Sequence, residues 1–274
     1  MISPHSALAM LIASLVVTAH PLGAPLFAGE REARLSLVRT RLDGGALRVW
    51  RRAIAGDDAA VLAMLLDKHA ADRTLLDERA GNGKSALMVA CKLGDLALAR
   101  RLVSAGDDPR ARTATGGTPF MFAVLGDRLE IARWLHGLGV ERDARGSNGW
   151  SAATIAAAKG FDEMLAWLLS IGADVDRADV YGFTPLMRAV DNGHLDVARR
   201  LLDAGVRIDA GDERGNAALH HAVAGGHAAL VALLLERGAE PAHANREGLT
   251  ALDLARSAAT PTLPASLLER LAGS

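Results

Sequence analysis

The chain has 274 residues, half of them apolar and 4% aromatic, so any core is built mainly from small and aliphatic side chains. Its 31 basic and 32 acidic residues are mixed along the sequence and give a formal net charge of −1. This balance excludes the electrostatic footprint of a protein that binds nucleic acid or an anionic membrane surface. The single cysteine, Cys91, allows neither an intramolecular disulfide nor a cysteine-based zinc site, and we expect it to be a small buried hydrophobe.

The N-terminal segment has the composition of a targeting sequence. Residues 1–28 contain no Lys, Arg, Asp or Glu, and residues 7–19 form an apolar run of signal-peptide length. Small residues follow at Ala19, Ala24 and Ala28, so we predict a signal peptide over residues 1–24 with its cleavage site between 19 and 28. The predicted location is periplasmic or secreted. The alternative is an inner-membrane anchor over residues 7–27, although a bilayer span needs about 20 apolar residues.

Residues 25–45 are predicted to form an N-terminal helical extension, based on the charged amphipathic stretch from Glu30 to Leu42. Residues 46–82 then predict a divergent capping repeat, with an irregular helix pair over 47–55 and 59–66 and an additional loop over 73–78. A terminal repeat is expected to be atypical because it presents a polar face to solvent.

After this segment, glycine recurs with a period of 33 residues, and alanine occurs seven positions after every one of these glycines. The pattern predicts five full repeats and a C-terminal capping repeat over 248–274. The five repeats occupy residues 83–115, 116–148, 149–181, 182–214 and 215–247.

The copy that begins at Gly182 shows what each repeat encodes. Thr184 is suited to cap a helix and Pro185 to occupy its first position. Gly193 can adopt the left-handed conformation that ends this helix, and a second apolar periodicity runs from Leu195 to the closing Gly205. Both predicted helices are shorter than the about 12 residues at which an isolated helix becomes marginal. Neighbouring copies must therefore stabilise each pair.

The Thr-Pro-Leu at 184–186, the Thr-Pro-Phe at 118–120 and the Gly-His pairs at 193–194 and 226–227 resemble the ankyrin repeat family. The resemblance implies an all-α ankyrin repeat solenoid of helix-turn-helix units with β-turn or hairpin fingers, with five full repeats plus divergent end repeats. A tetratricopeptide array, the nearest alternative, has a period of about 34 and an aromatic pattern that this chain lacks.

Three residues depart from the repeat pattern or match a family feature. Asp127 stands where the glycine between the two helices belongs, and Asp tolerates the left-handed conformation better than most residues. Ala217 replaces the capping hydroxyl, which predicts a weakened inner helix. His220 occupies a position that resembles the hydrogen-bonding histidine of the family.

The sequence predicts no catalytic, cofactor-binding or metal site. Its glycines follow the repeat period and form no phosphate-binding loop, and a nucleophile elbow does not occur. His220 and His221 are the nearest approach to a ligand pair, but adjacent residues on a helix point about 100° apart.

The resemblance implies binding through the finger tips and the inner-helix face. Four apolar or aromatic residues fall on adjacent tips, where solvent exposure is expected, and three charged residues can surround them. Exposed aromatic residues are favoured interface anchors. The alternative is that the rings only pack against one another. We call this set the tip patch: Trp150, Lys159, Val180, Tyr181, Phe183, Arg188 and Asp191.

We therefore predict a non-enzymatic protein–protein interaction scaffold that uses its concave finger and inner-helix surface. The Ala- and Arg-rich composition and the predicted signal favour a bacterial exported ankyrin repeat protein. We expect a monomer with a protein partner, without nucleic acid, and without a membrane unless the N-terminal segment stays uncleaved. One alternative is a translocated effector that acts on host proteins through the same surface. Another is an enzyme with an unrecognised site in the N-terminal segment, between Glu30 and Glu78.

Overall fold

The computed structural model describes residues 45–69, 74–257 and 263–273. The described residues belong to one compact unit, residues 45–274. The predicted signal peptide and the predicted helix over Glu30–Leu42 lie outside the described residues. Within the described ranges, no helix combines the length and apolar character that crossing a membrane requires.

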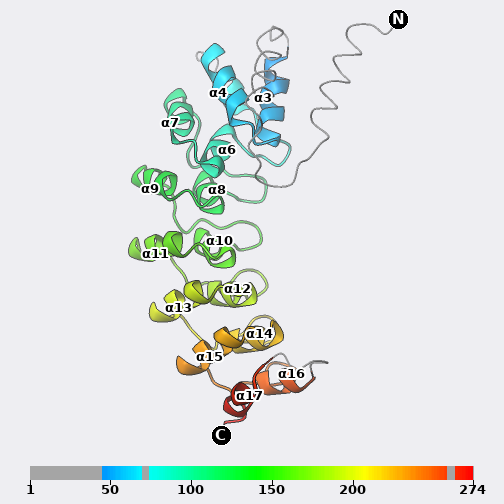
Figure 1. Cartoon of the computed structure of the whole chain (residues 1–274). Helices are drawn as coiled ribbons and strands as arrows, with labels where there is room; N and C mark the ends of the chain where they lie inside the picture. The colour runs from blue at the N-terminus through cyan, green and yellow to red at the C-terminus, as the bar shows by residue number, and fades with distance from the viewer. Residues whose placement is uncertain (1–44, 70–73, 258–262, 274) are drawn as a thin grey trace, which may run out of the picture. The chain divides into compact units, whose positions relative to one another are not determined.

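Helices in antiparallel pairs make up the described unit (Figure 1). It begins with α3 (Ala46–Ala55), α4 (Ala59–Lys68) and the short α5 (Thr74–Asp77). The inner helices that follow are α6 (Ala86–Leu93), α8 (Pro119–Leu125), α10 (Ala152–Lys159), α12 (Pro185–Asp191), α14 (Ala218–Ala224) and α16 (Ala251–Ser257). The outer helices are α7 (Leu96–Ala105), α9 (Leu129–Gly137), α11 (Asp162–Ser170), α13 (Leu195–Asp203), α15 (Ala228–Glu236) and α17 (Ala265–Leu271).

Apart from these helices, the described residues contain one isolated β-bridge, between Ala244 and Thr250, and no strand. Each inner helix from α6 to α16 contacts the next inner helix, so the pairs stack in chain order. The predicted all-α solenoid of helix-turn-helix units is confirmed.

Local chemistry at the helix ends follows the sequence pattern. The Thr184 hydroxyl accepts a hydrogen bond from the Met187 amide at 3.3 Å, and Pro185 opens α12. Gly193 has a φ of 75°, as predicted for the turn between the two helices. Asp127, which replaces this glycine in the second full copy, adopts a φ of 55°. The prediction that Asp127 accommodates the left-handed turn is confirmed.

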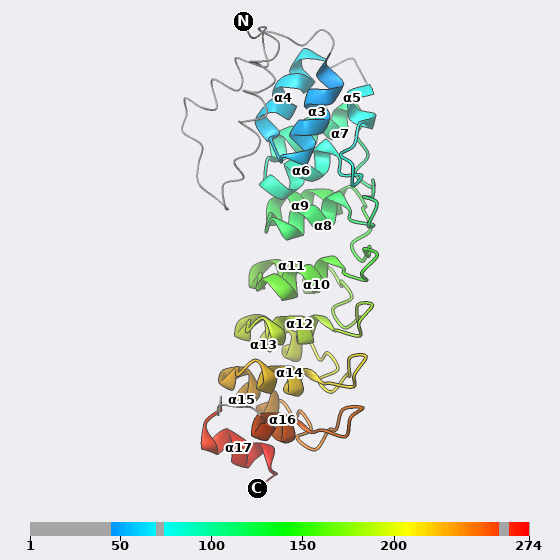
Figure 2. The same ribbon diagram turned by 90° about the vertical axis from the view of Figure 1, so that its right-hand side faces the viewer.

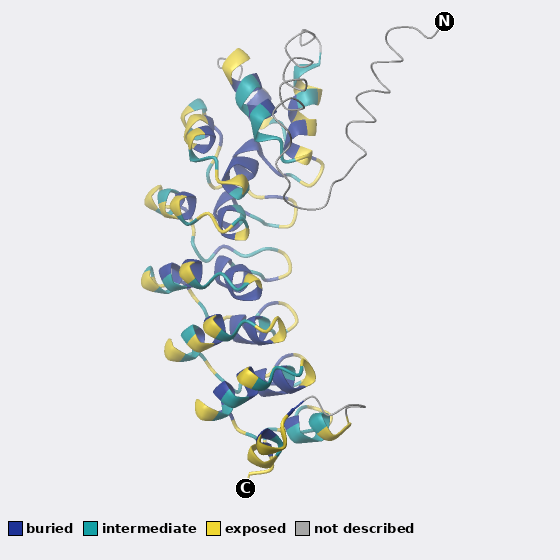
Figure 3. Ribbon diagram, viewed as in Figure 1, coloured by how far each residue is buried: buried dark blue, intermediate teal, exposed yellow. Residues whose placement is uncertain are grey.

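Small side chains allow the inner helices to pack closely, and these helices form the core (Figure 3). Every residue of α10 from Ala152 to Ala158 is buried, and five of these seven residues are alanine. Cys91 on α6 is fully buried, as predicted, and burial raises the pKa of its thiol. The core is therefore thin and aliphatic, which agrees with the low aromatic content.

The prediction of a loop over residues 73–78 is wrong for the central residues of that segment. Residues Thr74–Asp77 form the short helix α5, and both Leu75 and Leu76 are buried. A helical turn pairs backbone groups locally while it places two adjacent leucines in the core, which an open loop does not do.

Before each inner helix, the chain makes a finger that turns at a glycine with positive φ (Figure 2). Gly182 has a φ of 80°, and a Cβ atom there would lie 2.8 Å from the Glu213 amide nitrogen of the next finger. Neighbouring fingers approach this closely because backbone hydrogen bonds join them. The amides of Ala114, Ser147, Val180, Glu213 and Arg246 donate to the carbonyls of Asn82, Thr115, Asn148, Tyr181 and Arg214 at 2.8–3.1 Å.

Candidate partner-binding site

Two buried aspartates close neighbouring fingers in the middle of the solenoid. Asp179 Oδ1 accepts hydrogen bonds from the Tyr181 and Phe183 amides at 2.9 and 3.0 Å. Asp212 Oδ1 does the same one repeat later, with the Arg214 and Asn216 amides at 2.8 and 2.9 Å. An Asp side chain that bonds to the backbone two residues ahead is a common way to form a turn. Each carboxylate therefore holds one finger in shape and retains a second oxygen for other contacts.

The second oxygen of Asp179 binds a cation from α12, the inner helix that follows its finger. Arg188 forms an ion pair with Asp179 Oδ2, with Nε at 3.0 Å, and the Trp150 indole N–H donates to the same oxygen at 3.1 Å. The Arg188 guanidinium carbon lies 4.0 Å from the Phe183 ring centre and 5.3 Å from that of Trp150. This arrangement combines a salt bridge with two cation–π contacts. Trp150, Phe183 and Arg188 thus form one network around a buried carboxylate.

Asp212 has a histidine where Asp179 has an arginine. His221 Nε2 lies 3.2 Å from Asp212 Oδ2, and the His221 ring centre lies 4.8 Å from that of Phe183. On the other side, His221 Nδ1 lies 3.7 Å from Asp191 Oδ1. Burial disfavours the charged form of Asp212, but hydrogen bonds from the Asn216 and Arg214 amides outweigh it and hold the pKa below its ordinary value. Asp212 is therefore a carboxylate at neutral pH.

His220, the neighbour of His221 on α14, has a structural role. Its Nδ1 accepts a hydrogen bond from the Ala217 amide at 3.2 Å, so its Nε2 carries the proton and donates to the Leu249 carbonyl at 3.1 Å. Burial lowers the pKa of His220, which favours this neutral form. The histidine joins its own helix start to the finger of the next repeat, in agreement with the hydrogen-bonding role that the resemblance implied.

The seven residues of the tip patch are not all alike in the structure. Val180 and Tyr181 are 48% and 57% exposed, the highest values among the large hydrophobic residues of the described ranges. Trp150 and Phe183 are half-buried, because they pack on Arg188. Lys159 and Asp191 are exposed, and Asp191 Oδ1 lies 3.7 Å from His221 Nδ1.

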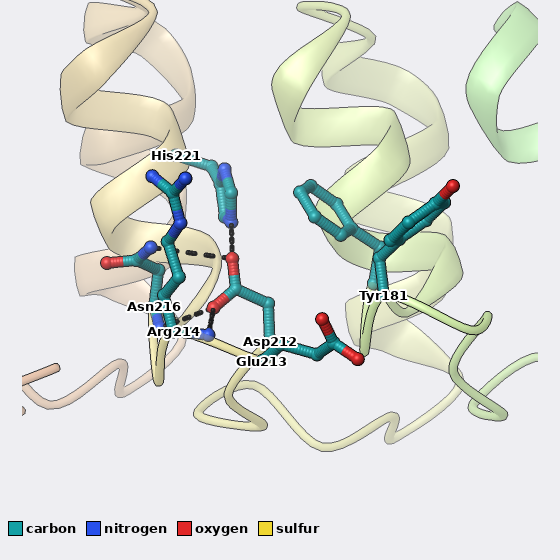
Figure 4. Close-up of a pocket in the computed structure, with 7 residues that line it drawn as sticks. Tyr181, Asp212, Glu213, Arg214, Asn216 and His221 are labelled. Atoms are coloured by element: carbon teal, nitrogen blue, oxygen red, sulfur yellow. Dashed lines mark hydrogen bonds and ion pairs between the residues drawn. The ribbon is translucent and has the colours of Figure 1, made fainter. Parts of the chain in front are cut away.

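A hollow of about 370 Å³ lies between the fingers that contain Tyr181 and Asp212 (Figure 4). In Figure 4, Glu213 points toward Tyr181, whereas Arg214 lies beside His221. A second hollow of about 220 Å³ shares Arg214, Asn216 and His221 with the first. The first hollow is lined by Tyr181, Phe183, Asp212, Glu213, Arg214, Asn216 and His221.

Sequence reasoning missed Asp179, Asp212 and His221 as parts of this site. A sequence pattern could have indicated this site. In each copy, the residue three positions before the finger glycine and the residue six positions after it change type together. Asp occurs with a basic residue in two copies, as Asp179 with Arg188 and Asp212 with His221. The other copies pair an uncharged residue with an apolar one: Ala80 with Val89, Thr113 with Phe122, Gly146 with Ile155 and Asn245 with Leu254.

The described residues contain no group of three or more His, Cys, Asp or Glu side chains placed to hold a metal ion. This face combines the exposed Tyr181 ring with charged groups around two hollows.

Comparisons with known proteins agree with this architecture. A family model described as ankyrin repeats (3 copies) matches residues 51–145 and 129–212, and one described as ankyrin repeats (many copies) matches residues 201–255. No curated protein matches the chain.

Two solved structures have the same fold. The ankyrin repeat domain of human ASB11 is 24% identical with a TM-score of 0.67, and the match covers 81% of this chain and 96% of that domain. The ankyrin repeat domain of Bcl-3, described as a unique member of the IkappaB protein family, is 27% identical with a TM-score of 0.63, over 82% of this chain and 98% of that domain. From the matched family models and the 33-residue stack of helix pairs, the chain belongs to the ankyrin repeat family.

Proposed function

We propose that this chain is a non-enzymatic scaffold that binds a protein partner through the face formed by its fingers and inner helices. Ankyrin repeat domains are generally protein–protein interaction modules. The observation that carries the choice of surface is the exposure of Val180 and Tyr181, at 48% and 57%, on the tip of one finger. Large exposed apolar groups beside polar residues mark interaction sites, and tyrosine is a preferred anchor.

The rigidity of this face supports the same function. Backbone hydrogen bonds join each finger to the next, and Asp179 and Asp212 hold their fingers from within. A surface that is already ordered loses little conformational entropy when a partner binds. Tyr181 therefore stands on a fixed support rather than on a loop that must order first.

The test uses binders selected from a displayed library of random peptides against the full chain. Each binder is then measured against a Val180→Ser/Tyr181→Ala double variant. We expect its Kd to rise by at least about tenfold, because the anchor and its neighbour are removed. The matched control is Leu138→Ala, since Leu138 is also exposed but follows the outer helix α9. Binders that lose affinity only through Leu138→Ala would overturn the proposal.

We also propose that the chain is exported to the periplasm or beyond. The support is the uncharged, apolar sequence of residues 1–28, which lies outside the described residues. Intact-mass measurement after cell fractionation tests it. A mature protein that begins after Ala19, Ala24 or Ala28 is the expected result, and a full-length membrane-bound chain would support an anchor over residues 7–27 instead.

A further inference from the structure

Neighbouring repeats carry equivalent buried carboxylates, but only one of the two has an internal cation of fixed charge. Asp179 is matched by the Arg188 guanidinium. Asp212 faces His221, and its other side-chain partner among the described residues is the Asn216 side-chain amide at 3.4 Å. The Asp212 site therefore lacks the arginine that the Asp179 site contains, and a hollow lies beside it.

The hollow beside Tyr181 is lined by more acidic residues than arginine or lysine residues. Asp212 and Glu213 contribute two carboxylates to its lining, and Arg214 is the one arginine or lysine that lines it. A hydrogen bond of 3.1 Å from the Glu213 amide to the Tyr181 carbonyl places the two residues on adjoining fingers. Glu213 points toward Tyr181 in Figure 4, and Arg214 lies on the His221 side of the hollow. The Tyr181 side of the hollow thus combines an exposed aromatic ring with a carboxylate.

We propose that this hollow receives an arginine or lysine side chain of the protein partner. The inference rests on the proposed function and specifies the chemistry of the partner segment. An aromatic ring attracts a cation through its electron-rich face, and a nearby carboxylate adds charge attraction and hydrogen bonding.

The molecule itself contains an example of this recognition one repeat earlier. The Arg188 guanidinium packs on Phe183 at 4.0 Å and on Trp150 at 5.3 Å, while its Nε donates to Asp179 Oδ2. In the hollow, Tyr181 and Glu213 offer a ring and a carboxylate, and within the described ranges no arginine or lysine packs on this ring or forms an ion pair with this carboxylate. A guanidinium is favoured over an ammonium because it can stack on a ring and bind a carboxylate with two donors at once.

The size of the hollow is compatible with a single long side chain. Its volume of about 370 Å³ exceeds what one residue needs, so adjacent partner residues can contact Val180 or the second hollow. In this arrangement the basic residue of the partner lies in the hollow, and neighbouring apolar residues of the partner contact Tyr181 and Val180. The expected motif is a basic residue next to an apolar one in an extended segment.

The decisive test uses peptides selected on the full chain, as described above. We expect selected peptides to contain an Arg or Lys whose replacement by Gln raises Kd by at least about tenfold. Glu213→Gln is expected to weaken binding of the original peptide by a similar factor, and to have little effect on the Gln peptide. Such a double-mutant cycle isolates the contact between the two groups. Glu236→Gln, a change at an exposed residue of the outer helix α15, is the control for net charge.

A second variant tests the comparison of the two repeats. His221→Arg supplies the cation that Arg188 supplies to Asp179, and we expect it to weaken binding of the basic peptide by at least about tenfold. His221→Gln retains a neutral polar group and is expected to stay within about threefold of the parent protein. Circular dichroism melting of each variant identifies any loss of folding.

The outcomes separate this inference from the proposed function. If binders depend on Val180 and Tyr181 but keep their affinity after Arg or Lys is replaced and after Glu213→Gln, the inference is wrong and the scaffold function stands. If binders ignore Val180 and Tyr181 altogether, the proposed surface itself is wrong.

Discussion

Asp179 and Asp212 occupy the same position in neighbouring repeats and cap the same kind of finger, yet they meet different cations. Arg188 closes the first site by filling the space beside the carboxylate and packing between Trp150 and Phe183. His221 leaves a hollow beside Asp212. The comparison teaches that equivalent buried carboxylates can lie in a filled site or beside a hollow, depending on one side chain of the following helix.

The largest expected effect follows from removing the cation at the closed site. Arg188→Met leaves the buried Asp179 carboxylate without its counter-charge, and we expect the free energy of unfolding to fall by about 3–5 kcal/mol. His221→Met, the matched change in the next repeat, should cost about 1 kcal/mol, because it removes one hydrogen bond to Asp212 and no guanidinium ion pair. Urea denaturation gives both values. Equal losses would show that the two sites are equivalent after all.

A third buried carboxylate, Asp107, makes the effect of burial on stability measurable as a pH dependence. Asp107 accepts a hydrogen bond from the Leu87 amide at 3.2 Å, and Arg79 Nη2 lies 3.6 Å from its other oxygen. Burial raises the pKa of Asp107 to about 6, despite the opposing effect of Arg79. A raised pKa in the folded state means that this group adds stability below its unfolded pKa, and that the stability is lost as pH rises through about 6.

Asp107→Asn should therefore raise the free energy of unfolding by about 2 kcal/mol at pH 7, and the advantage should disappear toward pH 4. Urea denaturation of both proteins at several pH values checks this, since effects of other titrating groups are common to both. A variant that is less stable than the parent at pH 7 would contradict the expectation.

A smaller effect is expected where neighbouring fingers touch. Gly182→Ala forces a non-glycine residue to a φ of 80° and places its Cβ 2.8 Å from the Glu213 amide nitrogen. Gly248 has a similar φ of 77°, but a Cβ atom added there by Gly248→Ala would meet no atom within 4 Å. The left-handed conformation costs about 1–2 kcal/mol at either position, and contact with the next finger should add about 1 kcal/mol at Gly182 only. Thermal melts of the two variants reveal whether finger contact has this additional cost.

The smallest effect concerns the helix that carries His221. Ala217 stands at the helix start, where Ser85 in the first full copy accepts a hydrogen bond from the Met88 amide at 3.3 Å. Ala217→Ser should restore this cap and add about 0.5–1 kcal/mol to the free energy of unfolding. Ser85→Ala is the matched reverse change and should remove a similar amount. A loss of stability on Ala217→Ser would mean that the buried site cannot hold the hydroxyl.

Much of the fold could be predicted because the repeat pattern is local and recurs. Thr184, Gly193 and Asp127 act within a few residues of their own position, and the structure places them as their chemistry indicates. The helix α5 was missed because Leu75 and Leu76 are too short a pattern to indicate a helix, and only burial against the first helix pair reveals their role.

The candidate site was less predictable from sequence, since its contacts join parts of different repeats. The tip position of Tyr181 and Val180 indicated exposure correctly. Trp150 and Phe183 pack against Arg188, and this contact depends on how one finger lies over the next inner helix. Asp212 and His221 were hidden for the same reason, although their recurrence three before and six after a finger glycine was visible in the sequence.

One series of hydrogen bonds between neighbouring fingers uses only backbone atoms, for example from the Glu213 amide to the Tyr181 carbonyl. The side chains at the tips therefore contribute nothing to these bonds and are available for other contacts. Substitution at a tip can change what the surface recognises while the connection between repeats persists. In evolutionary terms, a single substitution at a tip leaves this backbone connection in place without a compensating change elsewhere in the solenoid.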